Sequence, residues 1–415
     1  MAIAVEALDT ADVRLHERPL GAAFWSMWTA TIVSALGDGL VLVAFPLLAT
    51  EHTSDARLIA GVAVAQRLPW LVCALLSGAL ADRFDRRRFL AIVEAARMAT
   101  LMSFSVLIAL QIGGLAVLYL AAFVLGTFET GFSAAALGAT PVLVDDEQLG
   151  RANGYLYAGQ TAGEQFVGPA VGGLLYALGP ALPFAADGLS FGMSALLISR
   201  ALANRTAAPD TPHESVLTDT RVGLAWFRQS RTARTLAASI ASLAFCQAMV
   251  LSVLVLLCIG TLHLTPGGYG LFLAVGAVGN VAGSALAAHV RSSTRVVLLG
   301  GGLTASAAYV VVALAPNAGV AASAFIIEAV AVALGNVASV SLRQRLIPPE
   351  MMGRVGNIFR SCIYGAMPVG ALAAGVLAEQ TSVQAAILAA AALQAALISL
   401  FVVRLPRHEV VRSPA

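Results

Sequence analysis

The chain has 415 residues, of which 59% are hydrophobic and only 12% are charged, against roughly a quarter charged in an average soluble domain. Its formal net charge of +2 lacks the strong basic excess that is typical of proteins that bind nucleic acids. All 25 basic side chains are arginine, so a Walker A phosphate loop and a Schiff-base lysine are both excluded.

Apolar segments make up most of the sequence, and twelve of them are long enough to cross a hydrocarbon core of about 30 Å as α-helices. The acidic tail before them, residues 1–21, lacks the basic region of a cleaved signal peptide. We expect helices at about 22–50, 57–81, 88–111, 114–142, 150–178, 181–203, 235–262, 267–289, 294–315, 318–343, 351–379 and 383–404.

A polar stretch, residues 204–234, separates six segments from the next six. Within it, Val216 to Gln229 has the pattern of an amphipathic helix that lies on the membrane surface. The sequence therefore predicts an N-terminal bundle at 22–203, a linker at 204–234, a C-terminal bundle at 235–404 and a tail at 405–415.

The arginines indicate how the chain is oriented. If both termini lie in the cytoplasm, 21 arginines fall in cytoplasmic segments and Arg57 alone falls outside, while Arg67, Arg97 and Arg360 fall within helices. Positive loops stay on the cytoplasmic side of a membrane. We therefore predict a multi-pass protein of the plasma membrane with both termini in the cytoplasm.

The two halves share a short repeat. Glu147-Gln-Leu-Gly-Arg151 follows the fourth segment, and Glu350-Met-Met-Gly-Arg354 follows the tenth. Equivalent positions in two sets of six helices indicate an internal duplication, which is typical of transporter folds.

Three motifs carry a family resemblance. Gly78-Ala-Leu-Ala-Asp82-Arg83-Phe-Asp85-Arg86-Arg87-Arg88 resembles the loop motif of the major facilitator superfamily, with Asp85 in place of a glycine. Gly168-Pro169-Ala-Val-Gly172-Gly173 resembles the helix 5 motif of its proton-linked exporters, with Glu164 in place of a glycine. Ser34 to Asp38 and Arg151 to Gly154 are similar to its macrolide-efflux and siderophore-exporter branch. The resemblance implies an all-α fold: twelve transmembrane helices in two six-helix bundles, related by pseudo-two-fold symmetry around a central cavity.

The loop motif predicts a conformational latch. A carboxylate at Asp82 can interact with the positive N-terminus of a neighbouring helix, and the resemblance implies that this neighbour is helix 11, which starts near Met351. The alternative is a solvated basic loop. The predicted latch residues are Gly78, Asp82, Arg83, Arg86, Arg87, Arg354 and Arg360.

Ionisable groups inside a membrane are costly and usually functional. Five carboxylates qualify as ionisable groups at mid-membrane: Asp38, Glu129, Glu164, Asp187 and Glu328. By depth, Asp38 matches Arg67, and Glu129 matches Arg97, for which Glu94 competes. Asp187 lies near a helix end, where an interfacial or structural role is expected.

Glu164 and Glu328 have no arginine at their depth, and an unpaired carboxyl group in a low dielectric can exchange protons near neutral pH. They are the first candidates for proton coupling, followed by Glu129 and Asp38. The alternative for each is a structural carboxylate that is hydrogen-bonded to a neighbouring helix.

Other patterns carry no chemistry. Gly188-Leu-Ser190-Phe-Gly192 matches a hydrolase nucleophile motif but lies within a membrane segment. Cys73, Cys246, Cys258 and Cys362 lie in apolar segments, and the six histidines lack metal-ligand spacing. Gly276, Gly279 and Gly283 are interpreted as helix-packing positions.

These features predict a non-enzymatic secondary transporter, working as a monomer among membrane lipids. It would export hydrophobic or amphipathic small molecules, such as drugs or secondary metabolites, with the proton gradient as its energy source and no cofactor or metal. The alternatives are a siderophore exporter, for which Arg67 or Arg97 would bind the anion, a lysophospholipid or lipid flippase, and a non-transporting scaffold or sensor. A nutrient importer is disfavoured by the helix 5 motif.

Overall fold

A computed structural model describes residues 19–72, 84–136, 138–203, 216–290, 292–348 and 351–405. Throughout this part of the chain the regular elements are helical, and ten helices are long and apolar enough to cross a membrane. Two further helical stretches occupy the expected second and fifth positions, residues 56–72 and 149–178. The all-α fold is therefore confirmed.

The elements before the linker form the N-terminal group. They are α2 (Ala22–His52), α3 (Ala56–Val72), α5 (Arg86–Ala109), α6 (Leu115–Ala136), α7 (Thr140–Leu143), the 3-10 turn η1 (Asp146–Gln148), α8 (Leu149–Thr161), the π-helical turn η2 (Ala162–Val167), α9 (Gly168–Leu178) and α10 (Leu182–Ala201).

The amphipathic helix α11 (Val216–Gln229) has the limits that the sequence predicts, and the C-terminal group follows it. This group consists of α12 (Arg231–Leu256), the π-helical turn η3 (Leu257–Thr261), α13 (Pro266–Ala287), α14 (Thr294–Leu314), α15 (Ala318–Leu346), α16 (Met352–Gln380) and α17 (Val383–Val402).

Local sequence signals explain where many of these helices begin. A helix start leaves free N–H groups that a short polar side chain can accept. The side chain at the N-cap accepts such a hydrogen bond at α5, α12, α13, α14, α15 and α17, where the caps are Asp85, Ser230, Thr265, Ser293, Asn317 and Ser382.

The fourth helix is shorter than predicted. We expected it at 114–142, whereas α6 ends at Ala136 and the separate short helix α7 begins at Thr140. Pro141 lies in the first turn of α7. Because proline disfavours helical geometry at the residue before it and donates no N–H, it starts a helix more readily than it continues one.

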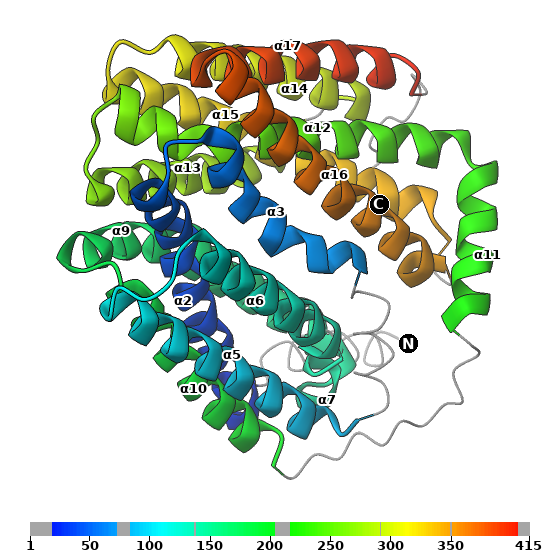
Figure 1. Ribbon diagram of the computed structural model, residues 1–415. Helices are drawn as coiled ribbons and strands as arrows, with labels where there is room; N and C mark the ends of the chain where they lie inside the picture. Colours follow the sequence, from blue (N-terminus) through cyan, green and yellow to red (C-terminus); the bar gives the residue numbers. More distant parts are fainter. Residues whose placement is uncertain are drawn as a thin grey trace.

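Figure 1 shows how the two groups of helices are arranged. They lie close together where α9 meets α13 and spread apart toward α11. Helices α3 and α16 run side by side between the groups. Large apolar side chains such as Leu178, Leu189 and Leu314 are more than half exposed on the outer helix faces, as lipid-facing residues are in a membrane protein.

Candidate functional site

Arg97 on α5 is a buried side chain at the centre of a charge cluster whose two closest carboxylates, on Asp38 and Glu129, are 31% and 32% exposed. Its side chain is 3% exposed, and its Nη2 donates to Asp38 Oδ1 at 2.8 Å and to Glu129 Oε2 at 2.6 Å. Glu94, one turn away on the same helix, lies 4.0 Å from Nη1. The guanidinium also lies 3.9 Å from the centroid of the Phe191 ring. One arginine thus holds together carboxylates from α2, α5 and α6.

This cluster confirms one predicted pair and corrects the other. Glu129 pairs with Arg97, as its depth predicts. Asp38 also pairs with Arg97, and the predicted Asp38–Arg67 pair is wrong. Matching depths place two residues at one level, but the rotation of each helix about its axis decides which side chains face each other.

Asp187 on α10 belongs to the same region, which contradicts the interfacial role and leaves the structural one of the two roles expected for it. It is fully buried, and its Oδ1 accepts a hydrogen bond from Ser190 at 3.0 Å. Gly37 of α2 allows this position, because a Cβ at Gly37 would overlap the Asp187 carboxylate. The glycine before Asp38 is the sequence signal that could have indicated this close packing.

Glu164 lies in the π-helical turn η2. The N–H of Gly168 bonds to the carbonyl of Gly163, five residues back, and Pro169 follows directly. Proline cannot donate to the preceding turn, which accounts for a local widening just before it. Such π-helical turns are frequent at functional sites.

These groups line one pocket of about 130 Å³, which we call the acidic pocket. Four carboxylates and two arginines border it, namely Asp38, Glu129, Glu164, Asp187, Arg67 and Arg97. With every group in its ionised form, the four carboxylates would outnumber the two arginines and leave the pocket with a negative charge. The remaining arginine, Arg67, lies 5.9 Å from the ring centroid of Tyr364, on α16.

Glu328 lies apart from the acidic pocket, on α15. It is 3% exposed, and its Oε1 accepts a hydrogen bond from the Tyr309 hydroxyl at 2.6 Å. Within the part of the chain that the structure describes, neither Glu328 nor Glu164 forms an ion pair. Arg67 nevertheless borders the same pocket as Glu164, so the prediction of no arginine at that level holds for Glu164 only in the sense that no ion pair forms.

The helix 5 motif brings backbones together on two sides. Gly168 and Gly172 lie against α2, where added Cβ atoms would come within 2.6 Å of Gly39 and 2.7 Å of Leu40. On the other side, a Cβ at Gly173 would lie 2.5 Å from the carbonyl oxygen of Pro266, at the start of α13 in the C-terminal group.

Helix α16 repeats this pair of contacts in the C-terminal group. Gly370 packs against the backbone of Phe245 on α12, and Gly375 packs against Ala60 on α3. In each group, therefore, a helix with small residues contacts the other group: α9 contacts α13, and α16 contacts α3. Gly276, Gly279 and Gly283 of α13 instead pack against α15 within their own group, as their interpretation as packing positions predicts.

The predicted latch is only partly within the structure, because Gly78, Asp82 and Arg83 lie outside the described residues. Arg86 Nη1 donates to the carbonyl of Gly138 at 2.8 Å, and Arg87 Nη1 to that of Ala203 at 3.4 Å. Both arginines thus connect segments of the N-terminal group. In the C-terminal group, Arg354 lies against Gly223 of α11 and Arg360 is exposed, so the latch itself stays a prediction.

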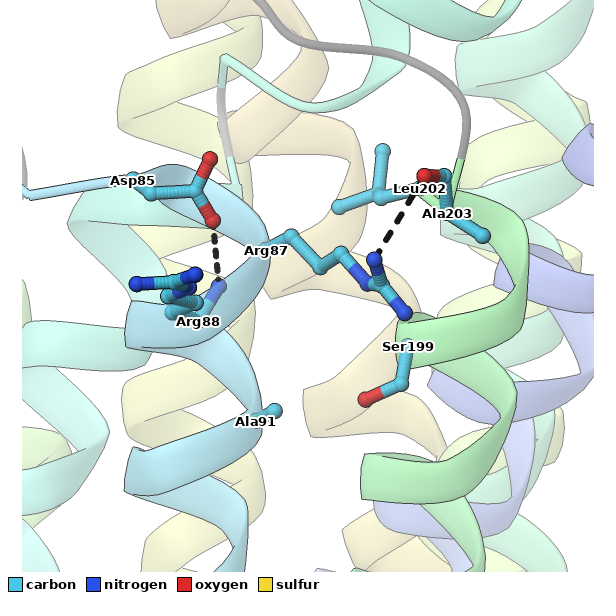
Figure 2. Close-up of a pocket in the computed structure, with 7 residues that line it drawn as sticks. All are labelled: Asp85, Arg87, Arg88, Ala91, Ser199, Leu202 and Ala203. Carbon is cyan, nitrogen blue, oxygen red and sulfur yellow. Dashed lines mark hydrogen bonds between the residues drawn. The ribbon is translucent and has the colours of Figure 1, made fainter.

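Figure 2 shows the pocket beside Arg87, of about 430 Å³. It lies between the start of α5 and the end of α10, with Asp85 capping α5 through the N–H of Arg88 at 2.8 Å. Because its walls come from the ends of two neighbouring helices, this pocket is separate from the charge cluster around Arg97.

Comparison with known proteins identifies the family. A family model described as transmembrane secretion effector matches residues 19–414. The chain belongs to the transmembrane secretion effector family. It is therefore a multi-pass membrane transporter and not an enzyme, and its resemblance to the major facilitator superfamily is confirmed.

Two curated relatives are efflux proteins. The multidrug efflux pump Tap of Mycobacterium tuberculosis is 33% identical over 186 residues, which cover 43% of this chain and 44% of Tap. Macrolide efflux protein A of Streptococcus pyogenes is 28% identical over 161 residues, which cover 37% of this chain and 38% of that protein. The chain thus matches less than half the length of these relatives.

Solved structures share the fold over most of the chain. The nucleoside transporter NupG superposes with a TM-score of 0.72 at 13% identity and covers 93% of this chain and 100% of its own. A bacterial homologue of the iron transporter ferroportin has a TM-score of 0.72 at 19% identity, with 93% and 100% coverage. At these identities the likeness concerns the fold alone.

Proposed function

We propose that this transporter exports cationic or neutral amphipathic small molecules, such as drugs or secondary metabolites, by proton-coupled alternating access. The observation that carries the proposal is the acidic pocket, in which four carboxylates face two arginines. A low-dielectric pocket with excess negative charge favours a cation, either a substrate's ammonium group or a proton. The curated relatives, which are multidrug and macrolide efflux proteins, support the same substrate class.

Competition between substrate and proton supplies the coupling. Asp38 and Glu129 stay with Arg97, whereas Glu164 lines the pocket without an ion pair. Ionised Glu164 attracts the cationic group of the substrate, and its protonation releases that group. Glu328, bonded to Tyr309 outside the acidic pocket, is the second candidate proton site.

The contacts between the two groups define the end that must open. Gly173 of α9 lies against α13, and Gly375 of α16 lies against α3. By the arginine distribution this end faces the outside, in the plasma membrane with both termini in the cytoplasm. Separation of these two contacts would give the bound substrate a route out of the cell.

The charge of the acidic pocket disfavours an anionic substrate. A siderophore would need free arginines, and Arg97 is held by Asp38 and Glu129. Arg67 alone would then face the two remaining carboxylates of the pocket, Glu164 and Asp187.

Proteoliposomes provide the test. Tetraphenylphosphonium transport is measured under an imposed pH gradient, with the membrane potential held at zero by valinomycin and equal potassium on both sides. We expect accumulation driven by the pH gradient, loss of it with a protonophore, and its loss in Glu164→Gln. The matched control is Asp145→Asn, which changes an exposed carboxylate.

Each outcome bears on a separate part of the proposal. Transport that ignores the pH gradient would refute proton coupling. Proton-driven transport that survives in Glu164→Gln but not in Glu328→Gln would move the coupling site to α15. The absence of tetraphenylphosphonium transport by folded wild-type protein would refute the proposed substrate class.

A further inference from the structure

The C-terminal group contains a second cavity, of about 240 Å³, which we call the apolar cavity. Its walls come from five helices, α12, α14, α15, α16 and α17. Most of the lining is apolar, with Leu243, Leu298, Ala305 and Gly335 among it, and the polar side chains on the walls include Ser339 and three carboxamides, Gln247, Asn336 and Gln394. No carboxylate lines it among the described residues, so its chemistry differs from that of the acidic pocket.

Small residues create this space. Ala305 and Gly335 stand on its walls, whereas Gly301 lets α14 approach α15, because a Cβ at Gly301 would lie 2.9 Å from the carbonyl oxygen of Ala331. A Cβ added at Gly335 would meet only Leu298, at 3.8 Å, which is an ordinary contact distance. The helix backbone at Gly335 therefore borders open space and not a packed neighbour.

Ser339 gives the cavity a specific polar group. Its side chain is 2% exposed, and its Oγ has no hydrogen-bond partner among the described residues. Buried serines elsewhere in these helices bond to their own backbone, as Ser306 does to the carbonyl of Gly302 at 2.8 Å. A buried hydroxyl without a partner is unfavourable, and such groups are normally hydrogen-bonded. Because Ser339 lines the cavity, its hydroxyl is the buried group there that still lacks a hydrogen-bond partner among the described residues.

The two chambers border the same turn of α16. Ile363 lines the apolar cavity. The next residue, Tyr364, stacks on Trp70 with ring centroids 4.3 Å apart, and Trp70 lines the acidic pocket. The acidic pocket, at about 130 Å³, holds a cationic head group but not the apolar body of an amphipathic drug.

We propose that the apolar cavity is a binding subsite for the neutral aromatic or branched aliphatic part of the substrate, with Ser339 bonding a polar atom on it. The subsite rests on the proposed function in that one ligand places its cation in the acidic pocket and its apolar part here. An apolar cavity of about 150 Å³ binds benzene, so about 240 Å³ accommodates a group larger than one phenyl ring.

The test uses benzophenone, a neutral diaryl ketone whose carbonyl can accept from Ser339 and which cross-links to nearby C–H groups under ultraviolet light. The purified full chain is irradiated in lipid nanodiscs, and the labelled residues are identified by peptide mass spectrometry. We expect labels on cavity residues such as Leu243 and Leu298. Excess tetraphenylphosphonium should reduce these labels by about tenfold, the effect of roughly 1.4 kcal/mol.

Two variants and a matched control complete the design. Gly335→Leu fills the cavity while favouring the helix, and should abolish the labels on cavity residues. Ser339→Ala keeps the shape and should reduce them several-fold. Gly300→Leu makes the same change at an exposed position with nothing within 4 Å of its added Cβ, and should leave them unchanged.

The outcomes separate the subsite from the proposed function. Labels confined to lipid-facing residues, or cavity labels that persist in Gly335→Leu, would overturn the subsite even if the protein exports tetraphenylphosphonium. Cavity labels that are lost in Gly335→Leu but not displaced by tetraphenylphosphonium would establish a cavity for neutral ligands and refute its link to the cation. Failure of transport with intact cavity labelling would count against the proposed function alone.

Discussion

The carboxylate of Glu379, at the end of α16, accepts a hydrogen bond at 3.0 Å from the backbone N–H of Ala56, the first residue of α3. The two residues are 323 positions apart and belong to different helix groups. A carboxylate at a helix N-terminus satisfies a free N–H group and interacts favourably with the helix dipole. In the predicted latch the roles are exchanged: Asp82, after α3 in the sequence, would interact with the N-terminus of α16.

The first prediction is that Glu379 stabilises the state in which this end is closed. Charge-assisted hydrogen bonds contribute about 1.5–3 kcal/mol, so Glu379→Ala should shift the equilibrium at least several-fold toward opening. The measurement is the distance distribution between spin labels on the outer ends of α3 and α16. Gln380→Ala changes the exposed neighbouring residue and is the control; identical distributions in both variants would contradict the prediction.

Acidification should not open this contact through Asp55. Its hydrogen bond with the Arg57 side chain lowers the pKa of Asp55 to about 2. The pKa of Asp55 in the folded protein lies below the usual pKa of an aspartate. The stabilising interaction is therefore fully present at any pH above that usual pKa, and it is lost as the pH falls through about 2. Asp55→Asn should therefore leave the pH dependence of transport unchanged between about pH 5 and 8, around physiological pH. A shifted pH profile in this variant would show that the N-terminus of α3 takes part in coupling.

Arg97 supports the third prediction. Removal of one partner from a fully buried ion pair costs about 3–5 kcal/mol. Because Asp38 and Glu129 are about a third exposed, we expect a smaller loss, and Arg97→Met should lower the thermal unfolding temperature. Without the guanidinium, Asp38 and Glu129 repel each other while ionised, and protonation relieves that repulsion. The variant should therefore regain stability relative to wild type as pH falls. Arg88→Met, at an exposed position of the same helix, is the control, and a pH-independent loss in Arg97→Met would argue that the arginine only fills space.

The fourth prediction concerns the close approach of α9 and α13. A Cβ at Gly270 would overlap the carbonyl oxygen of Pro169, whereas one at Gly268 would meet its neighbours at 3.4 Å. Gly270→Ala should therefore separate the two helices and slow transport, while Gly268→Ala on the same helix should not. Cysteine-labelling rates at the outer end of α13 report the separation. Equal rates in the two variants would show that the helices adjust without opening.

The sequence predicts the positions of the helices better than it predicts which side chains pair between them. Length and hydropathy locate the helices, and Val216 and Gln229 are found as the limits of α11 because the amphipathic pattern is local. Depth along a helix also finds the Glu129–Arg97 pair. Depth alone cannot find the Asp38–Arg97 pair, since it ignores helix rotation.

Other parts of the site have no local sequence signal. Asp187 is buried because Gly37 lets α10 approach α2, and the Glu379–Ala56 bond joins residues from separate halves. The orphan hydroxyl of Ser339 depends on space left by several helices. Each of these features depends on how helices pack, which the residue pattern of one helix does not contain.

The last prediction tests Glu328 through its partner. Tyr309→Phe removes only the hydroxyl that donates to Glu328 at 2.6 Å, and an unsatisfied buried carboxylate should cost at least about 1–3 kcal/mol. If Glu328 is then replaced in Tyr309→Phe/Glu328→Met, both polar groups are gone, and most of the stability should return. Thermal unfolding of the two single variants and the double variant measures this coupling directly. Additive losses of stability in the double variant would mean that the two side chains stabilise the protein independently. If the double variant is stable but its transport no longer responds to the pH gradient, a coupling proton is placed on Glu328.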